Sequence, residues 1–197
     1  MTRPKASSKK LADIIRSVTE IALKPLKLFF QDESRFGRIS QTIRCWSPIG
    51  QRPVVPSQII REYIYAYGAV CPQDGNFCSL VLPDLRTVCL NIFLKELSQR
   101  YPDYHLLVVF DGASSHRSGE LEIPENMTLV PLPPYSPELN PQENVWSQIK
   151  EEGFYNKAFD CLDDVEDQLV QVLRQFEQQP TRLQKLTSFD WILNALI

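Results

Sequence analysis

Three acidic residues follow or begin predicted secondary-structure elements, which could bring their side chains together at one site. Asp32 and Asp111 end the short apolar runs 27–31 and 106–110, and Glu143 stands in the first turn of a helical segment that follows a proline-rich loop. Apolar runs of this length, rich in aromatic and β-branched residues, predict buried strands. If the two strands are neighbours, their aspartates lie side by side. With a glutamate from a helix packed on the sheet, they would suit hard divalent cations.

Such a set of carboxylates is the arrangement that two-metal phosphoryl transfer needs. One ion activates the attacking oxygen and the other stabilises the leaving oxygen, with the ions about 4 Å apart. We therefore predict that Asp32, Asp111 and Glu143 are the catalytic residues and also the ligands of two Mg²⁺ or Mn²⁺ ions. Either aspartate taken alone could equally be a polar cap on its strand, and it is the set of three that favours catalysis.

Longer motifs surround the three carboxylates. They are FQDESRFG at 30–37, VFDGASSH at 109–116 and LPPYSPELNPQENVW at 132–146. Together they resemble the catalytic domain of DDE transposases of the mariner superfamily, in particular the bacterial insertion-sequence group numbered six-thirty. The third motif is the most specific, because a proline-rich run leading into Asn-Pro-x-Glu-x-x-Trp rarely arises by chance. Gly112 stands where the pattern usually has Asn, and Gln142 where it usually has Ile, but neither change removes a carboxylate.

The resemblance implies an α/β, RNase H-like fold with a mixed five-stranded sheet flanked by helices. It also implies divalent-metal-dependent cleavage and strand transfer of DNA, with transposon ends and a TA target as substrates and a homodimer on DNA. Transposases of this group read their ends with N-terminal helix-turn-helix modules. Nothing before Asp32 is long enough for two such modules. We therefore expect the DNA-reading part to be missing or encoded separately, for example in an overlapping frame.

Composition is that of an ordinary globular domain. The chain has 197 residues, 43% of them hydrophobic and 23% charged, and no apolar stretch approaches the roughly 18 residues of a membrane span. Its basic N-terminus is not followed by the apolar core of a signal peptide. The five cysteines form no Cys-x-x-Cys pair, so reduced thiols fit better than a zinc ribbon or a disulfide framework. We expect a bacterial cytoplasmic, nucleoid-associated protein that has no membrane partner.

Charge is unevenly distributed along the chain. Residues 1–61 hold twelve Lys and Arg against four Asp and Glu, a balance of +8, whereas residues 62–197 have a balance of −11. The basic third can contact a phosphate backbone, and the acidic remainder is unusual for a stand-alone DNA binder. Four basic side chains near the carboxylates are secondary candidates for nucleic-acid contacts, although each could instead be solvated or bonded to backbone. They are Arg35, Arg38, His116 and Lys150.

Periodicity and turn signals place the remaining elements. We expect strands at 27–32, 61–71, 77–82, 106–111 and 127–132, and helices at 11–23, 87–100, 141–152, 163–178 and 181–197. This order suits an RNase H-like sheet. It divides the chain into a basic tail and linker helix at 1–25, a catalytic domain at 26–160 and C-terminal helices at 161–197 packed on it. Residues 44–55 are expected to form a short strand and a turn, with Trp46 as a core anchor, and Trp146 is expected to be a packing residue.

Two other functions remain open at the level of the sequence. Another RNase H-like nuclease, such as a resolvase or a retroviral-type integrase, could use the same carboxylates, but the Pro-Pro-Tyr-Ser-Pro run argues against both. A catalytically inactive or recruited copy that only binds DNA or a partner is favoured by the acidic balance and opposed by the intact carboxylates. A metal-dependent cleavage assay separates that reading from the transposase.

Overall fold

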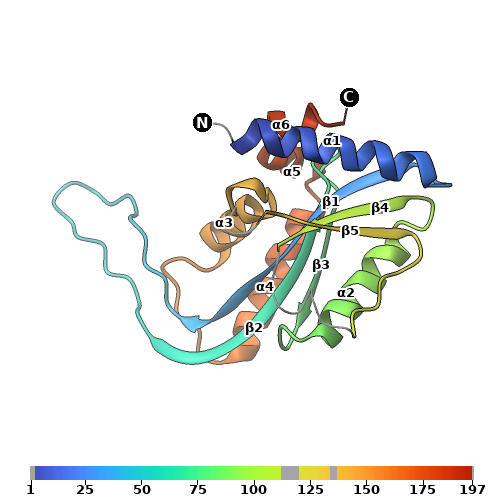
Figure 1. Cartoon of the computed structure of the whole chain (residues 1–197). Coiled ribbons are helices and arrows are strands. Elements are labelled where there is room, and N and C mark those ends of the chain that lie inside the picture. The colour runs from blue at the N-terminus through green and yellow to red at the C-terminus, as the bar shows by residue number, and fades with distance from the viewer. Residues whose placement is uncertain (1–2, 112–119, 134–136, 197) are drawn as a thin grey trace.

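The apolar runs pair into one mixed sheet in the order β3-β2-β1-β4-β5 (Figure 1). The computed structural model describes residues 3–111, 120–133 and 137–196. The strands are β1 (Leu26–Ile39), β2 (Ile59–Val70), β3 (Phe77–Leu82), β4 (His105–Phe110) and β5 (Met127–Pro131). The first three strands form an antiparallel meander, whereas β4 and β5 add to β1 in parallel. The mixed five-stranded sheet is the one expected from the sequence, and the strands follow one another along the chain in the expected order.

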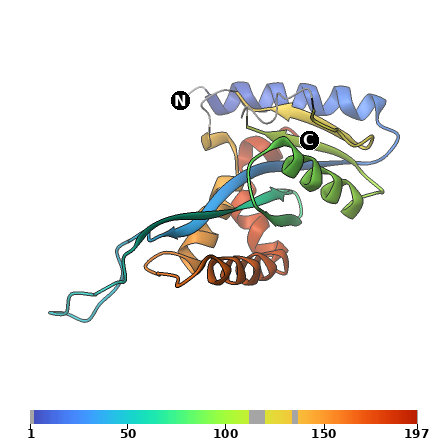
Figure 2. The same cartoon turned by 90° about the horizontal axis from the view of Figure 1, so that it is seen from below.

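Helices cover both faces of the sheet (Figures 1 and 2). They are α1 (Arg3–Ile21), α2 (Thr87–Arg100), α3 (Gln142–Gly153), α4 (Leu162–Glu177), α5 (Pro180–Thr187) and α6 (Asp190–Leu193), with a 3-10 turn η2 (Pro137–Leu139) before α3. Successive strand residues point to opposite faces. Phe29 accordingly packs in the core under α2, whereas Leu28 and Phe30 pack with the other helices.

Both ends of the chain differ from the expectation. The first helix begins at Arg3 rather than at Leu11, so the predicted tail is largely helical. Leu11 and Val18 are buried in the core, and this anchorage lets the helix extend toward the N-terminus. At the other end, α5 and α6 replace the single expected helix. The break falls at Ser188, whose hydroxyl donates to Gln184 O and Pro72 O.

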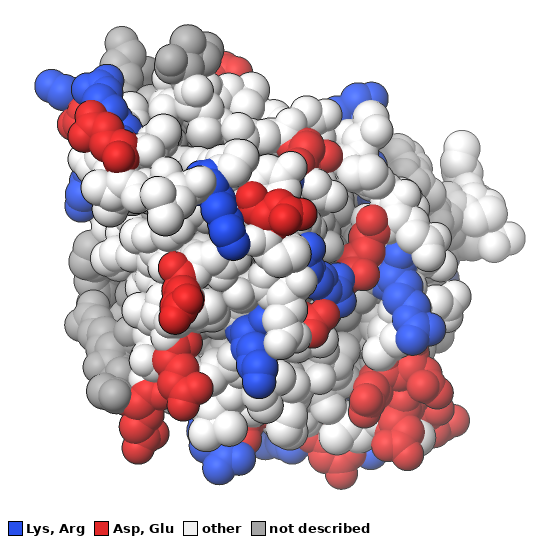
Figure 3. All heavy atoms as spheres, turned by 90° about the vertical axis from the view of Figure 1, so that its right-hand side faces the viewer, with Lys and Arg blue, Asp and Glu red and all other residues white. Residues whose placement is uncertain are grey.

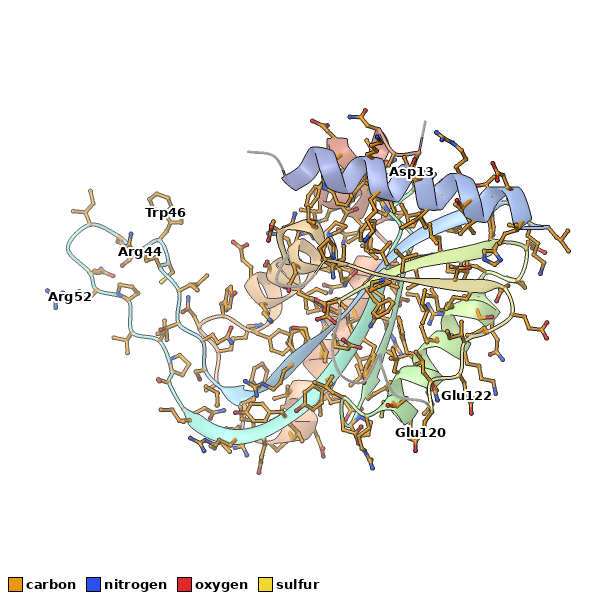
Figure 4. The ribbon with its side chains drawn as sticks, viewed as in Figure 1. Asp13, Arg44, Trp46, Arg52, Glu120 and Glu122 are labelled. Atoms are coloured by element: carbon orange, nitrogen blue, oxygen red, sulfur yellow. The ribbon has the colours of Figure 1, made fainter. Side chains whose placement is uncertain are left out.

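Residues 40–58 form an arm that projects from the sheet (Figure 1). β1 does not end at Asp32 but runs on to Ile39, because Phe36 continues the buried alternation and the strand stays paired with β2. Beyond it, the expected strand within 44–55 is absent from the described structure, and Trp46 is fully exposed, with a relative accessibility of 103%. The prediction that Trp46 anchors the core is therefore wrong. Figure 4 shows its ring pointing into solvent, with no layer of the fold facing it.

The base of the arm is nevertheless fastened to the connection between α3 and α4. Arg38 donates to the carbonyls of Phe159 and Asp160 and forms an ion pair with Glu62 at 2.8 Å. On the same side, Asn156 accepts a hydrogen bond from the backbone N–H of Ile43 at 2.9 Å. These contacts hold the place where the arm leaves the sheet, next to the end of α3.

The face seen in Figure 3 carries interspersed acidic and basic side chains, and several acidic side chains gather at its lower right. Within the described ranges, no helix has both the length and the apolar character needed to cross a membrane.

Candidate active site

The aspartates of the first two motifs lie on adjacent strands at the same edge of the sheet. β1 and β4 run parallel, with Phe30 opposite Val109, so Asp32 and Asp111 each follow that pair by two residues. Phe30 and Val109 both belong to the core cluster that also holds the buried side chains of α1, α3 and α6. The two-residue spacing of a strand therefore directs Asp32 to this same face, where it is 8% exposed. Asp111 lies just past the end of β4 and is exposed.

Helix α3 carries the glutamate and is tied to the strand that carries Asp32. Asn140, which is buried, donates from Nδ2 to the carbonyl of Gln31 at 3.2 Å and accepts from the backbone N–H of Gln142 at 3.1 Å. Pro141 precedes the helix with φ near −65°, a value that suits a helix start. Glu143 consequently stands in the first turn of α3, and the bridge fastens this end of the helix to β1 next to Asp32. The role of Asn140 was not predicted, although its place in the motif was a signal.

The charges of neighbouring acidic side chains act on the carboxyl group of Asp32. The pKa of Asp32 is raised to about 8, chiefly because burial disfavours its charged form, and then because the charges of Glu143, Glu33 and Asp111 repel it. The backbone N–H of Glu33 acts in the opposite direction. A buried carboxyl among like charges is the environment in which a bound cation is most strongly stabilised.

Asp32 also has a neutral partner beneath the sheet. The indole Nε1 of Trp146 donates to Oδ2 of Asp32 at 3.1 Å, and Trp146 is 1% exposed. The expectation that Trp146 packs in the core holds, but its polar contact was missed. Its spacing of three residues after Glu143 on a helix was the available signal, because such residues share one side.

Basic groups border the carboxylates on the side of the arm. The pKa of Lys150 is lowered by burial, while the charges of Glu143 and Asp32 act to raise it. The guanidinium of Arg35 stacks 4.3 Å from the ring centre of Tyr63. Arg35, Lys150 and Lys157 line one hollow of about 30 Å³ between β1 and α3, and Lys157 was not anticipated.

The other two basic candidates are placed differently. Arg38 uses its guanidinium to hold the base of the arm, as described above, so it is not open toward the carboxylates. His116 lies outside the described residues.

Oxygen ligands of the kind that Mg²⁺ and Mn²⁺ prefer are thus available from Asp32, Asp111 and Glu143. Among the side chains that the structure describes, no three Asp, Glu, His or Cys are placed together so that they could hold a metal ion. The donor set still fits a divalent cation, because burial and mutual repulsion leave Asp32 without compensation for a negative charge. An open set of carboxylates also leaves coordination positions for water and substrate oxygens.

The sheet order and the carboxylates on its helix-covered face define the class, an RNase H-like catalytic domain. Residues 27–166 match the DDE superfamily endonuclease family, and the chain belongs to it. The predicted fold class and family are confirmed. A protein of Sinorhizobium fredii, the uncharacterized protein y4pE/y4sA, is 34% identical over 130 residues, which are 66% of this chain and 96% of that protein.

Solved structures with the same fold include those of Mos1 transposase. The catalytic domain of Mos1 mariner transposase matches with a TM-score of 0.57 at 10% identity, covering 99% of this chain and 95% of that one. A pre-cleavage Mos1 transpososome matches with a TM-score of 0.61 at 13% identity, covering 98% of this chain and 63% of that one. The chain thus spans somewhat less than two thirds of the Mos1 chains in those assemblies.

Proposed function

We propose that this chain is the catalytic half of a DNA transposase that cleaves and transfers DNA strands with a divalent-metal-dependent set of carboxylates. The observation that carries the proposal is that Asp32 and Asp111 lie on the adjacent parallel strands β1 and β4, and that the charges of Asp111 and Glu143 both act on Asp32, in a chain of the DDE endonuclease family. Membership of that family supports nuclease chemistry. The likeness to Mos1 supports the fold on which the chemistry would be built.

The three carboxylates would hold one or two Mg²⁺ or Mn²⁺ ions. When bound, such ions supply positive charge and Lewis acidity at a phosphate. Asp32 contributes a carboxylate from the rigid interior of the sheet, and Glu143 contributes one from the first turn of a helix. Asp111, at the end of β4, completes the set from the neighbouring strand. Mos1 complexes have been solved with Mg and with Mn, which supports the same choice of ions here.

The proposed reaction has two balanced steps. Water attacks a phosphodiester at the element's end, the bond from phosphorus to the 3′ oxygen breaks, and a 3′-hydroxyl is released. That hydroxyl then attacks a phosphodiester of the target, whose own 3′ oxygen leaves. Arg35, Lys150 and Lys157 border the site on one side, where they would attract the phosphates of the bound strand.

The proposed partners follow from this role. The DNA substrates are transposon ends and target DNA, with TA as the target dinucleotide of the family that the motifs resemble. Reading of the end sequence would come from a separate helix-turn-helix part, and two copies of the chain would act together. Such work would place the protein on the bacterial nucleoid.

Substitution of Asp111 by asparagine tests the proposal. Asp111→Asn keeps the shape of the side chain but loses the charge that would hold a cation. We expect it to abolish Mg²⁺- or Mn²⁺-dependent nicking of supercoiled plasmid while leaving the circular dichroism spectrum unchanged. The exposed Asp103→Asn, which removes one charge elsewhere, is the matched control and should cleave as the wild type does. Metal-dependent cleavage by Asp111→Asn at the wild-type rate would refute the assignment. Absence of cleavage by the wild type would favour a recruited, inactive copy.

A further inference from the structure

The hydrogen bond from Trp146 to Asp32 uses all the hydrogen-bonding capacity of the indole. An indole has one N–H donor and no acceptor, and here Nε1 donates to Oδ2 of Asp32 at 3.1 Å. Both side chains are buried, so water does not compete for the bond. The donor is neutral at every pH and contacts one named oxygen of the carboxylate.

The indole ring is held by aromatic neighbours on two strands, one of which is β1 itself. Its centre lies 6.2 Å from the ring of Phe36 on β1 and 6.3 Å from that of Phe77 on β3, both in edge-on arrangements. Such pairs have defined geometry and stabilise one orientation of the rings. The direction of the N–H is therefore set by packing that does not involve Asp32.

Gly68 on β2 makes room for this arrangement. It is the cross-strand neighbour of Asp32. A Cβ at position 68 would lie 2.7 Å from Cη2 and 2.8 Å from Cζ2 of Trp146, closer than real carbon atoms approach. Only glycine lets the indole pass over β2 and reach the carboxylate on the neighbouring strand.

We propose that Trp146 is a positioning residue for Asp32, and that Gly68 provides the opening in the sheet that this contact requires. The proposal rests on the proposed function, in which Asp32 helps to hold a divalent cation. By fixing Oδ2, the indole would orient the whole carboxyl group and so the oxygens that it offers to a cation. Hydrogen-bonding partners of this kind typically change metal affinity or activity by about 10- to 100-fold.

The first measurement tests the contact without metal or DNA. The chain has three tryptophans, whose indole N–H signals can be assigned in ¹⁵N spectra through Trp46→Phe and Trp191→Phe. Asp32→Asn should move the signal of Trp146 and leave that of Trp46, on the arm, in place. An unmoved Trp146 signal would overturn the proposal.

The second measurement tests the consequence for the cation. We would replace Trp146 by benzothienylalanine, in which sulfur takes the place of the indole N–H at nearly constant shape. Mn²⁺ binding in the absence of DNA would be followed by the electron paramagnetic resonance of the free ion. The dissociation constant should rise by about 10-fold or more. The same replacement at Trp191 is the control and should leave it unchanged, whereas Gly68→Ala should weaken binding because it displaces the indole.

The outcomes separate the two proposals. If the replacement at position 146 binds Mn²⁺ as the wild type does while Asp32→Asn does not bind it, Trp146 has only a packing role and the carboxylate assignment stands. If Asp32→Asn also binds Mn²⁺ like the wild type, the assignment of Asp32 fails, and the positioning role fails with it.

Discussion

The fold buries the carboxyl group of Asp32 in surroundings that disfavour its charged form. Burial beneath α3 is the largest reason for its raised pKa of about 8, followed by the charge of Glu143. Without a compensating cation, the group therefore keeps its proton at neutral pH. A cation that binds there must displace this proton, so cation binding and proton release are coupled.

The stability of the cation-free chain should therefore fall as pH rises. The pKa of Asp32 in the folded chain lies above the ordinary value of 3.8, so the folded state binds the extra proton between the two values. The stability linked to this proton is fully present below about pH 4 and is lost as pH rises through about 8. At pH 8.5 with EDTA, we expect Asp32→Asn to be more stable than the wild type by about 1–3 kcal/mol, with the difference shrinking toward pH 5.

Urea denaturation at the two pH values measures this difference. Asp103→Asn is again the control, because it removes an exposed carboxylate. A wild-type chain that gains stability relative to Asp32→Asn between pH 5 and 8.5 would contradict the assigned direction of the pKa shift.

At the scale of elements, the buried interface between α3 and β2 is unusually polar. Gln142 is fully buried, and neither atom of its side-chain amide has a hydrogen-bonding partner in the described structure. Its Nε2 would lie only 2.7 Å from a Cβ on Gly68, so the amide is pressed against the strand. Position 142 is also where the motif departs from the usual isoleucine. The helix start is thus held by Asn140 and Trp146 rather than by Gln142.

We predict that Gln142→Ile stabilises the chain. The substitution removes two buried polar atoms that lack partners, and each such group costs about 1–3 kcal/mol. Allowing for imperfect packing of the branched side chain, a gain of about 1–2 kcal/mol is expected from urea denaturation. Gln171→Ile on the exposed side of α4 is the control for a general effect of the substitution and should change little. A loss of stability in Gln142→Ile would contradict this prediction and would indicate that the side-chain amide of Gln142 makes a stabilising hydrogen bond.

For the molecule as a whole, the charge distribution limits how it can bind DNA. Most basic residues of the first third lie on α1, β1 and the arm, where Figure 4 shows Arg44 and Arg52. Contacts from such side chains go to phosphates, which position a protein but do not read sequence. α1 buries Leu11 and Val18, so it is held along the body of the fold rather than offered to a groove.

We therefore expect this chain alone to bind duplex DNA weakly, without sequence preference and with a strong dependence on salt. Fluorescence anisotropy with an element-end duplex and a scrambled duplex, from about 50 to 300 mM salt, measures all three properties. Over much of this range, a protein that makes several phosphate contacts loses DNA affinity by a factor of about 10³–10⁵. Tight binding that favours the element end would reveal a recognition surface within this chain.

The arm has a separate consequence for assembly. Trp46, Ile49 and Val54 are each almost wholly exposed along it, and a protruding segment of this kind has nothing in its own fold to cover it. Exposed apolar groups that cluster in this way mark interaction sites. Under the proposed function, in which two copies of the chain act together, we expect the arm to contact the second copy.

Trp46→Ser combined with Ile49→Ser should shift the chain from dimer to monomer in sedimentation equilibrium. Val88→Ser, which changes an exposed apolar residue on α2, is the control and should leave the mass unchanged. A mass that does not respond to the arm substitutions would show that the arm serves another partner, such as DNA.

Much of the site was predictable because it is encoded locally. The apolar runs before Asp32 and Asp111 have the length and the aromatic and β-branched content of buried strands, and the motif around Glu143 begins a helix through Pro141. These patterns depend on near neighbours in the chain. They were enough to identify the three acidic candidates, whereas the fold class and the family were implied by the resemblance of the three motifs to DDE transposases.

Only the tertiary structure decided which side chains are buried and what they touch there. Trp46 and Trp146 are the same residue type in similarly ordinary local contexts, yet one lies in solvent and the other bonds Asp32. Likewise, the two backbone carbonyls that accept hydrogen bonds from Arg38 lie in a segment more than 100 residues away. Burial and polar pairing arise from contacts between distant segments, so local periodicity does not encode them. That is why the sequence determined the carboxylates, whereas the packing of α3 on the sheet determined how Asp32 is held.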